Sequence, residues 1–439
     1  MKPSQAPDSF AVPTGGTVAG DAHPPGSKSI TQRYFNLALL GNQPLTIHRP
    51  LLSEDTHFFL KALETCGARV QVAADQVKID PGEGPAEGAE IFCGAGGTMF
   101  RFLTAALAAV PGSWQIDGIQ RLRERPIQPL VEALRQLGAE VEYLREEGFA
   151  PLGIQGKSLV GGECVLDAGA SSQYLSSLLM AALAAPKPST IRVEKLTSEP
   201  YVALTLDAIA ELGGIVRRHS AGLYHVLPSE LEVREVTVEA DFSSVAYPAA
   251  AAALTGGKLR IRPINAESRQ GDRRFLDLLE GMGAEVRWLE GGILEVQGHD
   301  LRAVEADLSA MPDQVPTLAA LAPFAAGTTR ILNVPHLRLK ESDRLAAMAR
   351  ELTRVGAEVD ELADGLVIPG IWHGQTPPTD SVEVDSWNDH RIAMSMALVG
   401  LRRPGVVVQE PMVVAKSYPN FWNDLSSWLG PSHFKESDA

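Results

Sequence analysis

The chain has 439 residues, of which 45% are hydrophobic and 21% are charged, and its formal net charge is −15. These values are typical of a folded globular protein of about two or three domains, and they argue against a disordered chain. The acidic balance argues against a nucleic acid or a membrane surface as a partner, because either would need a basic face. An anion-binding site would therefore have to be a local cluster of lysine and arginine.

The cysteine usage and the N-terminal residues both bear on the compartment. Cys66, Cys93 and Cys164 have no metal-like spacing, which predicts a reducing compartment and hence a cytoplasmic protein. Residues 1–21 lack a basic stretch followed by an apolar core, so no secretory signal is predicted. No apolar run is long enough to predict a transmembrane helix.

The first polar loop of the chain is Pro-Gly-Ser-Lys-Ser at residues 25–29, and it leads into an apolar run at residues 34–40. This pattern predicts a loop that opens onto a helix N-terminus, where backbone N–H groups lack partners and carry partial positive charge. With Lys28 and Arg33 beside it, such a terminus suits a phosphate. On these residues alone, an ordinary solvated helix cap remains the alternative.

A helix that ends in glycine and runs on into a strand recurs along the chain. The pattern is close to Leu-x-x-Gly-Ala-x-Val, and its glycines lie about 70 to 75 residues apart. Each copy is typical of an amphipathic helix, a glycine C-cap and a strand. The marker glycines are Gly67, Gly138, Gly213, Gly283, Gly356 and, in a shorter copy, Gly430.

A short polar loop that opens an Ala- and Leu-rich helix precedes the glycine pattern in each copy. These loops lie near residues 27–29, 96–98, 171–173, 242–244, 312–314 and 388–391. The helices are apolar nearly all round, so we expect them to be buried. The two patterns together predict about six strand–helix–strand–helix–strand units, with chance similarity in ordinary α/β content as the alternative. If the helix N-termini converge, they would form one electropositive cleft.

Most charged residues in these loops are cationic. Several cations in one cleft would indicate substrates that carry more than one phosphate or carboxylate, although each cation alone fits a solvated surface charge. Gly97 would let backbone amides approach a ligand closely, with a plain turn as the alternative. The cations are Lys28, Arg33, Arg101, Arg125, Lys340, Arg344, Arg391 and Lys416.

Two carboxylates, Asp313 and Glu341, are candidates for acid and base chemistry, because nearby lysine and arginine should favour the ionised form that a base needs. Asp343 and Asp389 are expected to be structural partners of neighbouring arginines. Ser171 and its neighbours could bind a ligand or merely cap a helix. No dinucleotide fingerprint, Walker loop or His/Cys cluster is present, so neither a cofactor nor a metal is predicted.

Six motifs, taken in their order along the chain, resemble the 3-phosphoshikimate 1-carboxyvinyltransferase (EPSP synthase) family over about residues 20–425. They are Pro-Gly-Ser-Lys-Ser at 25–29, Gly97-Thr98 with Arg101, Arg125-Pro126-Ile127, Ser171-Ser172-Gln173, Lys340-Glu341-Ser342-Asp343-Arg344 and Asn388-Asp389-His390-Arg391. The resemblance implies an α/β (α+β) fold of two similar domains, each with three βαβαββ repeats around buried parallel helices (an inverse α/β prism). It places residues 25–239 in one domain, residues 1–24 with 240–439 in the other, and the active site in the interdomain cleft.

The reaction that the resemblance implies moves the enolpyruvyl group of phosphoenolpyruvate to the 5-hydroxyl of shikimate 3-phosphate. Phosphate leaves through a tetrahedral addition intermediate, and a monomer without a cofactor is implied. Asp313 would accept the hydroxyl proton, and Glu341 and Lys28 would handle proton transfer at the methylene carbon. Desolvating two polyanions side by side needs such cations.

The resemblance also implies two sets of ligand residues. Shikimate 3-phosphate would be held by Lys28, Ser29, Arg33, Ser171, Ser172, Gln173, Ser198, Asp313, His336 and Lys340. Phosphoenolpyruvate would be held by Lys28, Gly97, Arg125, Gln173, Arg344, Arg391 and Lys416. Glyphosate competes for the second pocket in this family, and Gly97 favours sensitivity.

The chain departs from the family pattern at three places, one of them a pair of residues. Ala95-Gly96 stands where asparagine-alanine is frequent, Phe102 where a proline is frequent, and His336 where an asparagine is common. Two alternatives remain: the sister enolpyruvyltransferase that acts on UDP-N-acetylglucosamine, and a non-catalytic anion-binding paralogue. The first usually has a cysteine near Arg125, which is missing here, and the second should lack the pair of Asp313 and Glu341.

Overall fold

The computed structural model describes residues 7–82 and 88–430. The chain divides into two compact units. The first unit is Gly26–Glu239, and the second unit joins the described residues up to Pro25 to those from Ala240 on. Both contain mixed sheets and buried helices, so each unit has a core of its own.

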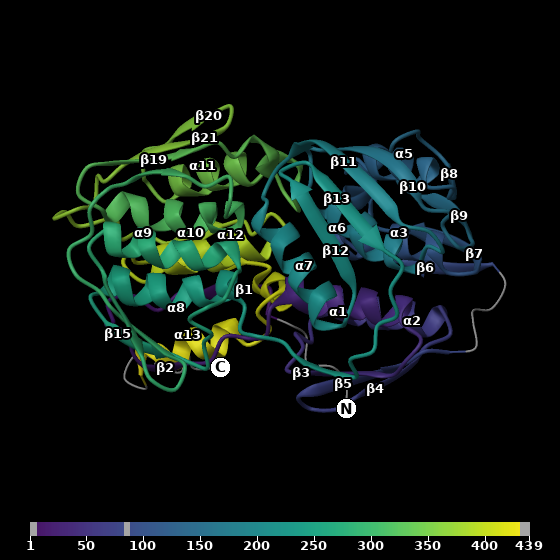
Figure 1. The fold of residues 1–439 in the computed structure, drawn as a ribbon. Helices are drawn as coiled ribbons and strands as arrows, with labels where there is room; N and C mark the ends of the chain where they lie inside the picture. The colour runs from purple at the N-terminus through teal and green to yellow at the C-terminus, as the bar shows by residue number, and fades with distance from the viewer. Residues whose placement is uncertain (1–6, 83–87, 431–439) are drawn as a thin grey trace. The chain divides into compact units, whose positions relative to one another are not determined.

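The described residues of the first unit form three four-stranded sheets, and Figure 1 shows one of them, with β11, β13 and β12 side by side. Their orders are β14-β3-β5-β4, β6-β7-β9-β8 and β10-β11-β13-β12. In each sheet the first two strands are parallel, and a hairpin adds the other two antiparallel. The strands are β3 (Leu45–His48), β4 (Arg69–Val72), β5 (Gln76–Asp80), β6 (Ala89–Phe92), β7 (Gly112–Asp117), β8 (Glu140–Tyr143), β9 (Leu152–Gly156), β10 (Gly162–Ala168), β11 (Ser189–Leu196), β12 (Ile215–Ser220), β13 (Leu223–Leu227) and β14 (Glu235–Thr237).

In the part of the first unit that the structure describes, three helices are buried and pack against one another, namely α1 (Lys28–Leu40), α3 (Gly97–Ala109) and α6 (Gln173–Ala181). Their many alanine and leucine residues explain this, because a helix that is apolar all round has no face for water. Each is the helix that follows a predicted polar loop, so their predicted burial is confirmed. The more exposed helices are α2 (Glu54–Thr65), α4 (Gln120–Arg123), α5 (Gln128–Gln136) and α7 (Pro200–Glu211), and the short 3₁₀ turn η1 (Ala182–Ala184) follows α6.

The second unit repeats this plan with sheets of order β16-β17-β15-β2, β18-β19-β21-β20 and β1-β23-β22. Its buried helices are α8 (Phe242–Thr255), α10 (Val315–Leu321) and α12 (His390–Gly400). Its other helices are α9 (Phe275–Gly281), α11 (Arg344–Arg354) and α13 (Phe421–Leu429), with 3₁₀ turns η2 (Gly271–Arg274), η3 (Pro312–Gln314), η4 (Ala322–Phe324), η5 (Pro335–Leu339) and η6 (Pro411–Lys416). Its strands are β1 (Ser9–Ala11), β2 (Ala19–Ala22), β15 (Lys258–Ile261), β16 (Glu285–Leu289), β17 (Ile293–Gln297), β18 (Glu305–Asp307), β19 (Thr328–Leu332), β20 (Asp360–Leu362), β21 (Gly365–Pro369), β22 (Val382–Val384) and β23 (Val406–Gln409).

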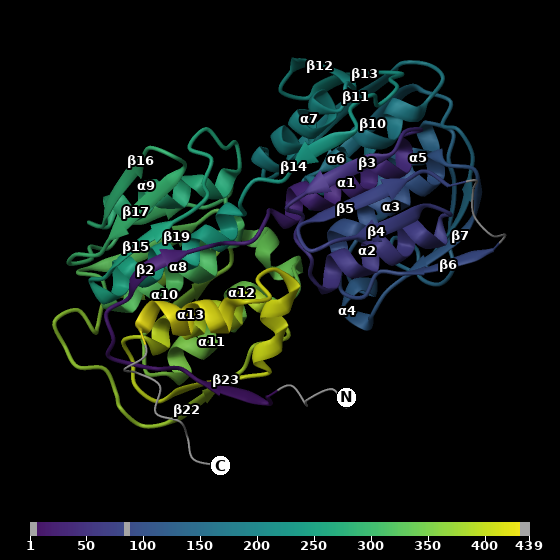
Figure 2. The same ribbon diagram turned by 90° about the horizontal axis from the view of Figure 1, so that it is seen from below.

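The N-terminal strands complete two sheets of the second unit. Strand β2 lies parallel to β15, and β1 lies antiparallel to β23, as Figure 2 shows for the purple segment. In the other sheets a hairpin strand occupies the position that β1 fills beside β23. The last repeat therefore borrows its antiparallel strand from the start of the chain.

The marker glycines end their helices as the sequence predicts. Gly67, Gly138, Gly213, Gly283 and Gly356 all have φ between +90° and +106°. This left-handed conformation closes a helix and is strained for other residues. Gly430 also has a positive φ, but the residues after it lie outside the described part of the chain.

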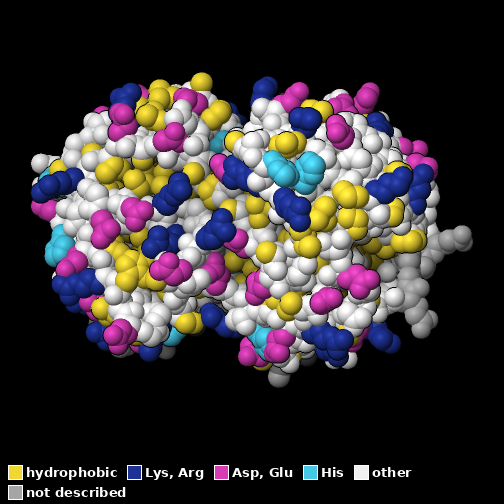
Figure 3. All heavy atoms as spheres, viewed as in Figure 1, with side chains coloured by type: hydrophobic (Ala, Val, Ile, Leu, Met, Phe, Trp, Pro, Cys, Tyr) yellow, Lys and Arg dark blue, Asp and Glu magenta, His cyan; other side chains and the backbone are white. Residues whose placement is uncertain are grey.

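Figure 3 shows Lys and Arg interspersed with Asp and Glu over the faces in view, rather than gathered by sign. Cys66, Cys93 and Cys164 are free and buried. Within residues 7–82 and 88–430, no helix combines the length and the apolar character that crossing a membrane requires.

Candidate active site

Lys28 is the first residue of α1, and Ser29 follows it. The ammonium nitrogen of Lys28 lies 3.6 Å from Oδ2 of Asp55, a buried residue in the first turn of α2. The carboxylate of Asp55 lowers the free-energy cost of keeping the Lys28 ammonium group charged where little water reaches it. Asp55 therefore holds Lys28 at a helix N-terminus, where the partial charge of the helix also favours an anion.

Arg33 is only 1% exposed, and all three of its guanidinium nitrogens donate hydrogen bonds within the first unit. The acceptors are Thr205 Oγ1 at 2.8 Å, the carbonyl of Ser29 at 2.6 Å and the carbonyl of Tyr201 at 2.7 Å. Burial lowers the pKa of Arg33 to about 10. In this structure Arg33 joins α1 to α7, and its expected contact with a substrate stays a prediction.

The N-termini of α3 and α6 lie together. Arg101 Nη1 donates to Oε1 of Gln173 at 2.7 Å, and Nε2 of the same amide donates to Thr98 Oγ1 at 2.8 Å. Gln173 is the first residue of α6, and Thr98 lies in the first turn of α3. The buried hydroxyl residues Ser171 and Ser172 directly precede Gln173, so they lie at the same place.

Gly97 lies against the guanidinium group of Arg125. A Cβ atom at Gly97 would stand 2.5 Å from Cζ and Nη1 of Arg125, which is too close for any real contact. Arg125 is buried, and its Nη1 lies 3.4 Å from the carbonyl of Ala95. Glycine is therefore required here for the arginine to keep this position. Ser198, also in the first unit, is buried and has a φ of +51°.

In the second unit, Arg391 brings the starts of three helices together. It lies in the first turn of α12, and its Nη2 donates to Asp313 Oδ2 at 2.6 Å and to Ser243 Oγ at 3.1 Å. Ser243 lies in the first turn of α8, and Asp313 lies in η3, which leads directly into α10. The starts of α8, α10 and α12 thus converge within this unit.

Arg344, the first residue of α11, binds three carboxylates and is only 2% exposed. Its Nη1 lies 2.9 Å from Asp313, its Nη2 lies 2.9 Å from Glu341, and its Nε lies 2.8 Å from Asp389. Burial opposes the charged form, but Asp389 and then Glu341 outweigh it and raise the pKa of Arg344. Asp389 is therefore an arginine partner, as predicted.

The carboxyl group of Asp313 is held ionised. Burial alone would raise its pKa, but Arg391, then Arg344 and Lys340, outweigh this and hold the pKa well below its usual range. The expectation that surrounding cations would favour the ionised form of Asp313 therefore holds. Asp313 bridges the guanidinium groups of Arg344 and Arg391.

Three further predicted ligand residues lie in 3₁₀ turns of the second unit or next to them. His336, in η5, is buried, and burial followed by the charge of Lys340 lowers its pKa to about 4, so the imidazole is neutral near pH 7. Lys340 directly follows η5. Lys416 is the last residue of η6 and is buried.

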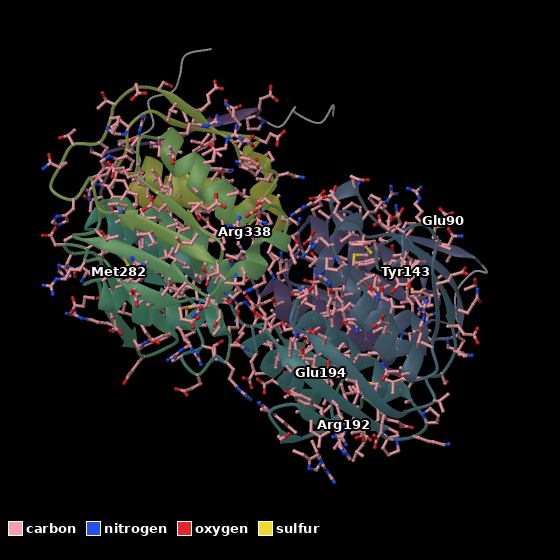
Figure 4. All side chains as sticks on the ribbon, turned by 90° about the horizontal axis from the view of Figure 1, so that it is seen from above. Glu90, Tyr143, Arg192, Glu194, Met282 and Arg338 are labelled. Carbon is pink, nitrogen blue, oxygen red and sulfur yellow. The ribbon has the colours of Figure 1, made fainter. Side chains whose placement is uncertain are left out.

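Arg338, labelled in Figure 4, anchors the segment that carries Lys340 and Glu341. Its Nη1 lies 2.9 Å from Asp343 and 2.7 Å from Glu361, and its Nη2 donates to a carbonyl at the end of β20 at 2.7 Å. Asp343 is therefore paired with an arginine, as predicted. These contacts fix the loop at both ends of the charged motif.

A buried carboxylate, Glu351 of α11, holds the loop before α12. It accepts hydrogen bonds from Trp387 Nε1 at 2.9 Å and from the backbone N–H of Asp385 at 3.1 Å, and it lies 3.2 Å from Arg354 Nε. Trp387 and Asn388 have φ values of +56° and +49°. Residues other than glycine adopt this left-handed backbone conformation only where the surrounding structure holds them in it. Glu351 supplies that constraint.

Replacing Glu351 by alanine should lower the free energy of unfolding by about 1–3 kcal/mol, because it leaves the indole N–H of Trp387 and the backbone N–H of Asp385 without their acceptor. The midpoint of urea unfolding measures this. Glu358→Ala, an exposed position after the same helix, is the matched control and should change the midpoint little. Equal midpoints for both variants would show that the Glu351 contacts are not needed.

The family model described as EPSP synthase (3-phosphoshikimate 1-carboxyvinyltransferase) matches residues 12–425. The chain belongs to the EPSP synthase family. A 3-phosphoshikimate 1-carboxyvinyltransferase of Syntrophobacter fumaroxidans is 44% identical over 404 residues, covering 91% of this chain and 94% of the relative. One of Erwinia tasmaniensis is 40% identical over 429 residues, covering 95% and 98%.

Two solved structures of related enzymes have the same fold as this chain. The EPSP synthase of Acinetobacter baumannii is 26% identical, with a TM-score of 0.78 over 96% of this chain and 98% of that one. The enolpyruvyl transferase NikO of Streptomyces tendae has the same TM-score at 18% identity and covers 96% and 97%, so it shows the fold alone. The EPSP synthase family, the carboxyvinyltransferase class and the mixed α/β fold predicted from the sequence are confirmed.

Several residues at the site of this EPSP synthase family member were missed in the sequence. Asp55 lies too far from Lys28 in the chain to suggest the pairing. Glu351 did carry a signal, because it follows Met348 by three residues and so falls on the apolar face of α11. Among the described residues, no group of three His, Cys, Asp or Glu side chains is arranged to hold a metal ion.

Proposed function

We propose that the chain transfers the enolpyruvyl group of phosphoenolpyruvate to the 5-hydroxyl of shikimate 3-phosphate, giving 5-enolpyruvylshikimate 3-phosphate and phosphate. The observation that carries this proposal is the ionised Asp313 between Arg344 and Arg391 at the start of three helices. A carboxylate in that position can act as a base, while the cations around it can hold anionic substrates. The names of the relatives support the choice of substrates.

The proposed domains are residues 25–239 and residues 1–24 with 240–439. Each contributes residues to the reaction, and the sets expected from the sequence are retained. The first contributes Lys28, Ser29, Arg33, Gly97, Arg125, Ser171, Ser172, Gln173 and Ser198. The second contributes Asp313, His336, Lys340, Glu341, Arg344, Arg391 and Lys416.

The proposed chemistry is an addition followed by an elimination. Asp313 accepts the proton of the 5-hydroxyl of shikimate 3-phosphate while the hydroxyl oxygen bonds to C2 of phosphoenolpyruvate. Lys28 or Glu341 gives a proton to the methylene carbon. In the second step the group that gave the proton, Lys28 or Glu341, takes one back from the resulting methyl group, the C–O bond to phosphate breaks, and the double bond forms again. The negative charges of the two substrates oppose the ionised form of Asp313, so their binding raises its proton affinity when the base is needed.

We further propose that the protein works as a monomer in the cytoplasm. All the expected ligand residues belong to one chain, which supports a monomer. The three buried free cysteines fit a reducing compartment.

The function is tested by measuring phosphate release from phosphoenolpyruvate with shikimate 3-phosphate and, separately, with UDP-N-acetylglucosamine. We expect turnover only with shikimate 3-phosphate. Turnover only with the nucleotide sugar would instead assign the sister activity, and binding of both substrates without turnover would indicate a non-catalytic paralogue.

Replacing Gly97 by alanine should raise the KM for phosphoenolpyruvate by about tenfold to a hundredfold, because the new Cβ displaces the Arg125 guanidinium. The inhibition constant for glyphosate should rise with it, while the melting temperature should change little, since the displaced group is the end of a flexible side chain. Gly281→Ala is the control, because a Cβ there meets nothing within 4 Å. An unchanged KM would exclude Gly97 and Arg125 from the phosphoenolpyruvate site.

A further inference from the structure

Ser243, in the first turn of α8, contacts Arg391 but has no part in the proposed chemistry. Its Oγ accepts a hydrogen bond from Nη2 of Arg391 at 3.1 Å and donates one to Oδ1 of Asp241 at 2.7 Å. Asp241, Ser243 and Arg391 are each no more than 6% exposed. The hydroxyl group therefore joins a buried carboxyl group to the guanidinium group that is proposed to hold phosphoenolpyruvate.

Asp241 fixes the direction of the Ser243 hydroxyl group. A hydroxyl group has one hydrogen to donate and can otherwise only accept. Because Ser243 gives this hydrogen to Asp241, a lone pair of its oxygen is left for Arg391. The backbone N–H of Ser243 also donates to Oδ1 of Asp241, at 2.9 Å, so the carboxyl group is held by the helix that it caps. Ser243 is thus an oriented acceptor.

The side chain of Gln270 fixes the backbone around Asp241. Its Oε1 accepts a hydrogen bond from the backbone N–H of Phe242 at 3.1 Å, and its Nε2 donates to the carbonyl of Ala240 at 2.8 Å. Gln270 is buried, so water competes little for these bonds. The start of α8 is thereby held on both sides of Asp241, and this fixes the acceptor that Ser243 offers.

Nη2 of Arg391 carries two hydrogens and donates to two acceptors. One acceptor is Oγ of Ser243, and the other is Oδ2 of Asp313, at 2.6 Å. Two acceptors on one nitrogen fix the plane of a guanidinium group, whereas Asp313 alone would let the group turn about a single contact. Ser243 therefore sets the direction in which the rest of the Arg391 guanidinium group faces.

We propose that Ser243 is a positioning residue that holds the guanidinium group of Arg391 in the orientation that binds phosphoenolpyruvate, without touching this substrate itself. The inference rests on the proposed function, since Arg391 is a proposed ligand of phosphoenolpyruvate. A guanidinium group that is already oriented binds an anion more tightly, because its rotation does not have to be restricted on binding. Loss of the Ser243 hydroxyl group should therefore weaken the binding of phosphoenolpyruvate more than it slows turnover.

Alanine removes the hydroxyl group and little else, so Ser243→Ala is assayed by steady-state phosphate release over a range of both substrates. The KM for phosphoenolpyruvate should rise by about tenfold, because hydrogen bonds to charged groups are the stronger kind. The KM for shikimate 3-phosphate should change little, and kcat should fall by a smaller factor than the KM for phosphoenolpyruvate rises. The melting temperature should fall only slightly, since the backbone N–H of Ser243 still donates to Asp241.

Ser395→Ala, on α12, is the matched control. It removes a buried hydroxyl group that has no hydrogen-bond partner among the described residues, from the same helix that carries Arg391. Both KM values of this variant should equal those of the wild type. Ser243→Thr keeps the hydroxyl group and should keep a KM for phosphoenolpyruvate close to that of the wild type. A rise as large as that in Ser243→Ala would count against the hydroxyl group.

Repeating Ser243→Ala in an Arg391→Lys background tests whether the effect passes through the guanidinium group. Lysine keeps the charge but lacks Nη2 and the planar group, so removing the hydroxyl group should add little to the KM for phosphoenolpyruvate there. The same rise in both backgrounds would show that Ser243 acts on something other than Arg391, and it would overturn the inference.

An unchanged KM for phosphoenolpyruvate in Ser243→Ala, or an equal rise in the KM of both substrates, would also overturn the inference and leave the proposed function intact. A wild type that releases no phosphate with shikimate 3-phosphate would instead overturn the proposed function.

Discussion

Replacing Lys28 by methionine is expected to lower kcat/KM by about a thousandfold or more. Lys28 is proposed to contact both substrates and to handle a proton, and removing one preorganised charge from a transition state usually costs about a hundredfold to a thousandfold. Methionine keeps the length and the apolar stem, so α1 should still form. Steady-state phosphate release over a range of both substrates measures the effect.

The ion pair between Lys28 and Asp55 means that Lys28→Met also changes the surroundings of Asp55, and a second substitution at Asp55 controls for this. Lys28→Met leaves the buried Asp55 without its ammonium partner, so some stability should be lost. Adding Asp55→Asn to the same chain should restore the melting temperature without restoring turnover. If the double variant regained near-normal turnover, the loss in Lys28→Met would come from the unpaired Asp55, and the substrate role of Lys28 would be wrong.

Replacing Arg344 by methionine is expected to abolish turnover and to lower the free energy of unfolding by about 3–5 kcal/mol. Arg344 contacts Asp313, Glu341 and Asp389 at 2.8–2.9 Å, so its loss leaves three carboxylates close together without their shared cation. Both proposed acid–base residues would then be displaced or protonated. Urea unfolding and phosphate release, measured on the same samples, test the two effects.

Two further variants serve as controls for Arg344→Met. Arg330→Met removes an arginine whose ion pair with Glu305 is largely exposed, and it should change stability by no more than about 1 kcal/mol. Arg344→Lys keeps the charge without the planar fork, so it should recover part of the stability but little of the turnover. If Arg344→Met unfolds at the urea concentration of Arg330→Met, the Arg344 contacts do not stabilise the second unit.

The repeats and the buried helices could be predicted from the sequence because both depend on local chemistry. A glycine such as Gly138 or Gly283 marks a helix end wherever it occurs, since few other residues adopt its positive φ. Helices such as α12 are apolar on all sides, which leaves burial as their stable location. The pairing of Asp389 with an arginine followed from the rule that buried charges need partners.

The parts that could not be predicted depend on contacts between distant segments. Strand β14 pairs with β3 at the other end of the first unit, and three residues carry too weak a pattern to fix that register. The helical position of Arg33 did not reveal that Thr205 and Tyr201 would take up its donors.

The most direct test of the proposed reaction follows the oxygen that joins C2 of phosphoenolpyruvate to phosphorus. This oxygen is labelled with oxygen-18, and the masses of the products formed with shikimate 3-phosphate are measured by mass spectrometry. The addition and elimination proposed here break the C–O bond, so all of the label should appear in inorganic phosphate, with one enolpyruvyl product formed for each phosphate. Label retained in pyruvate, or phosphate released without an enolpyruvyl product, would contradict the account.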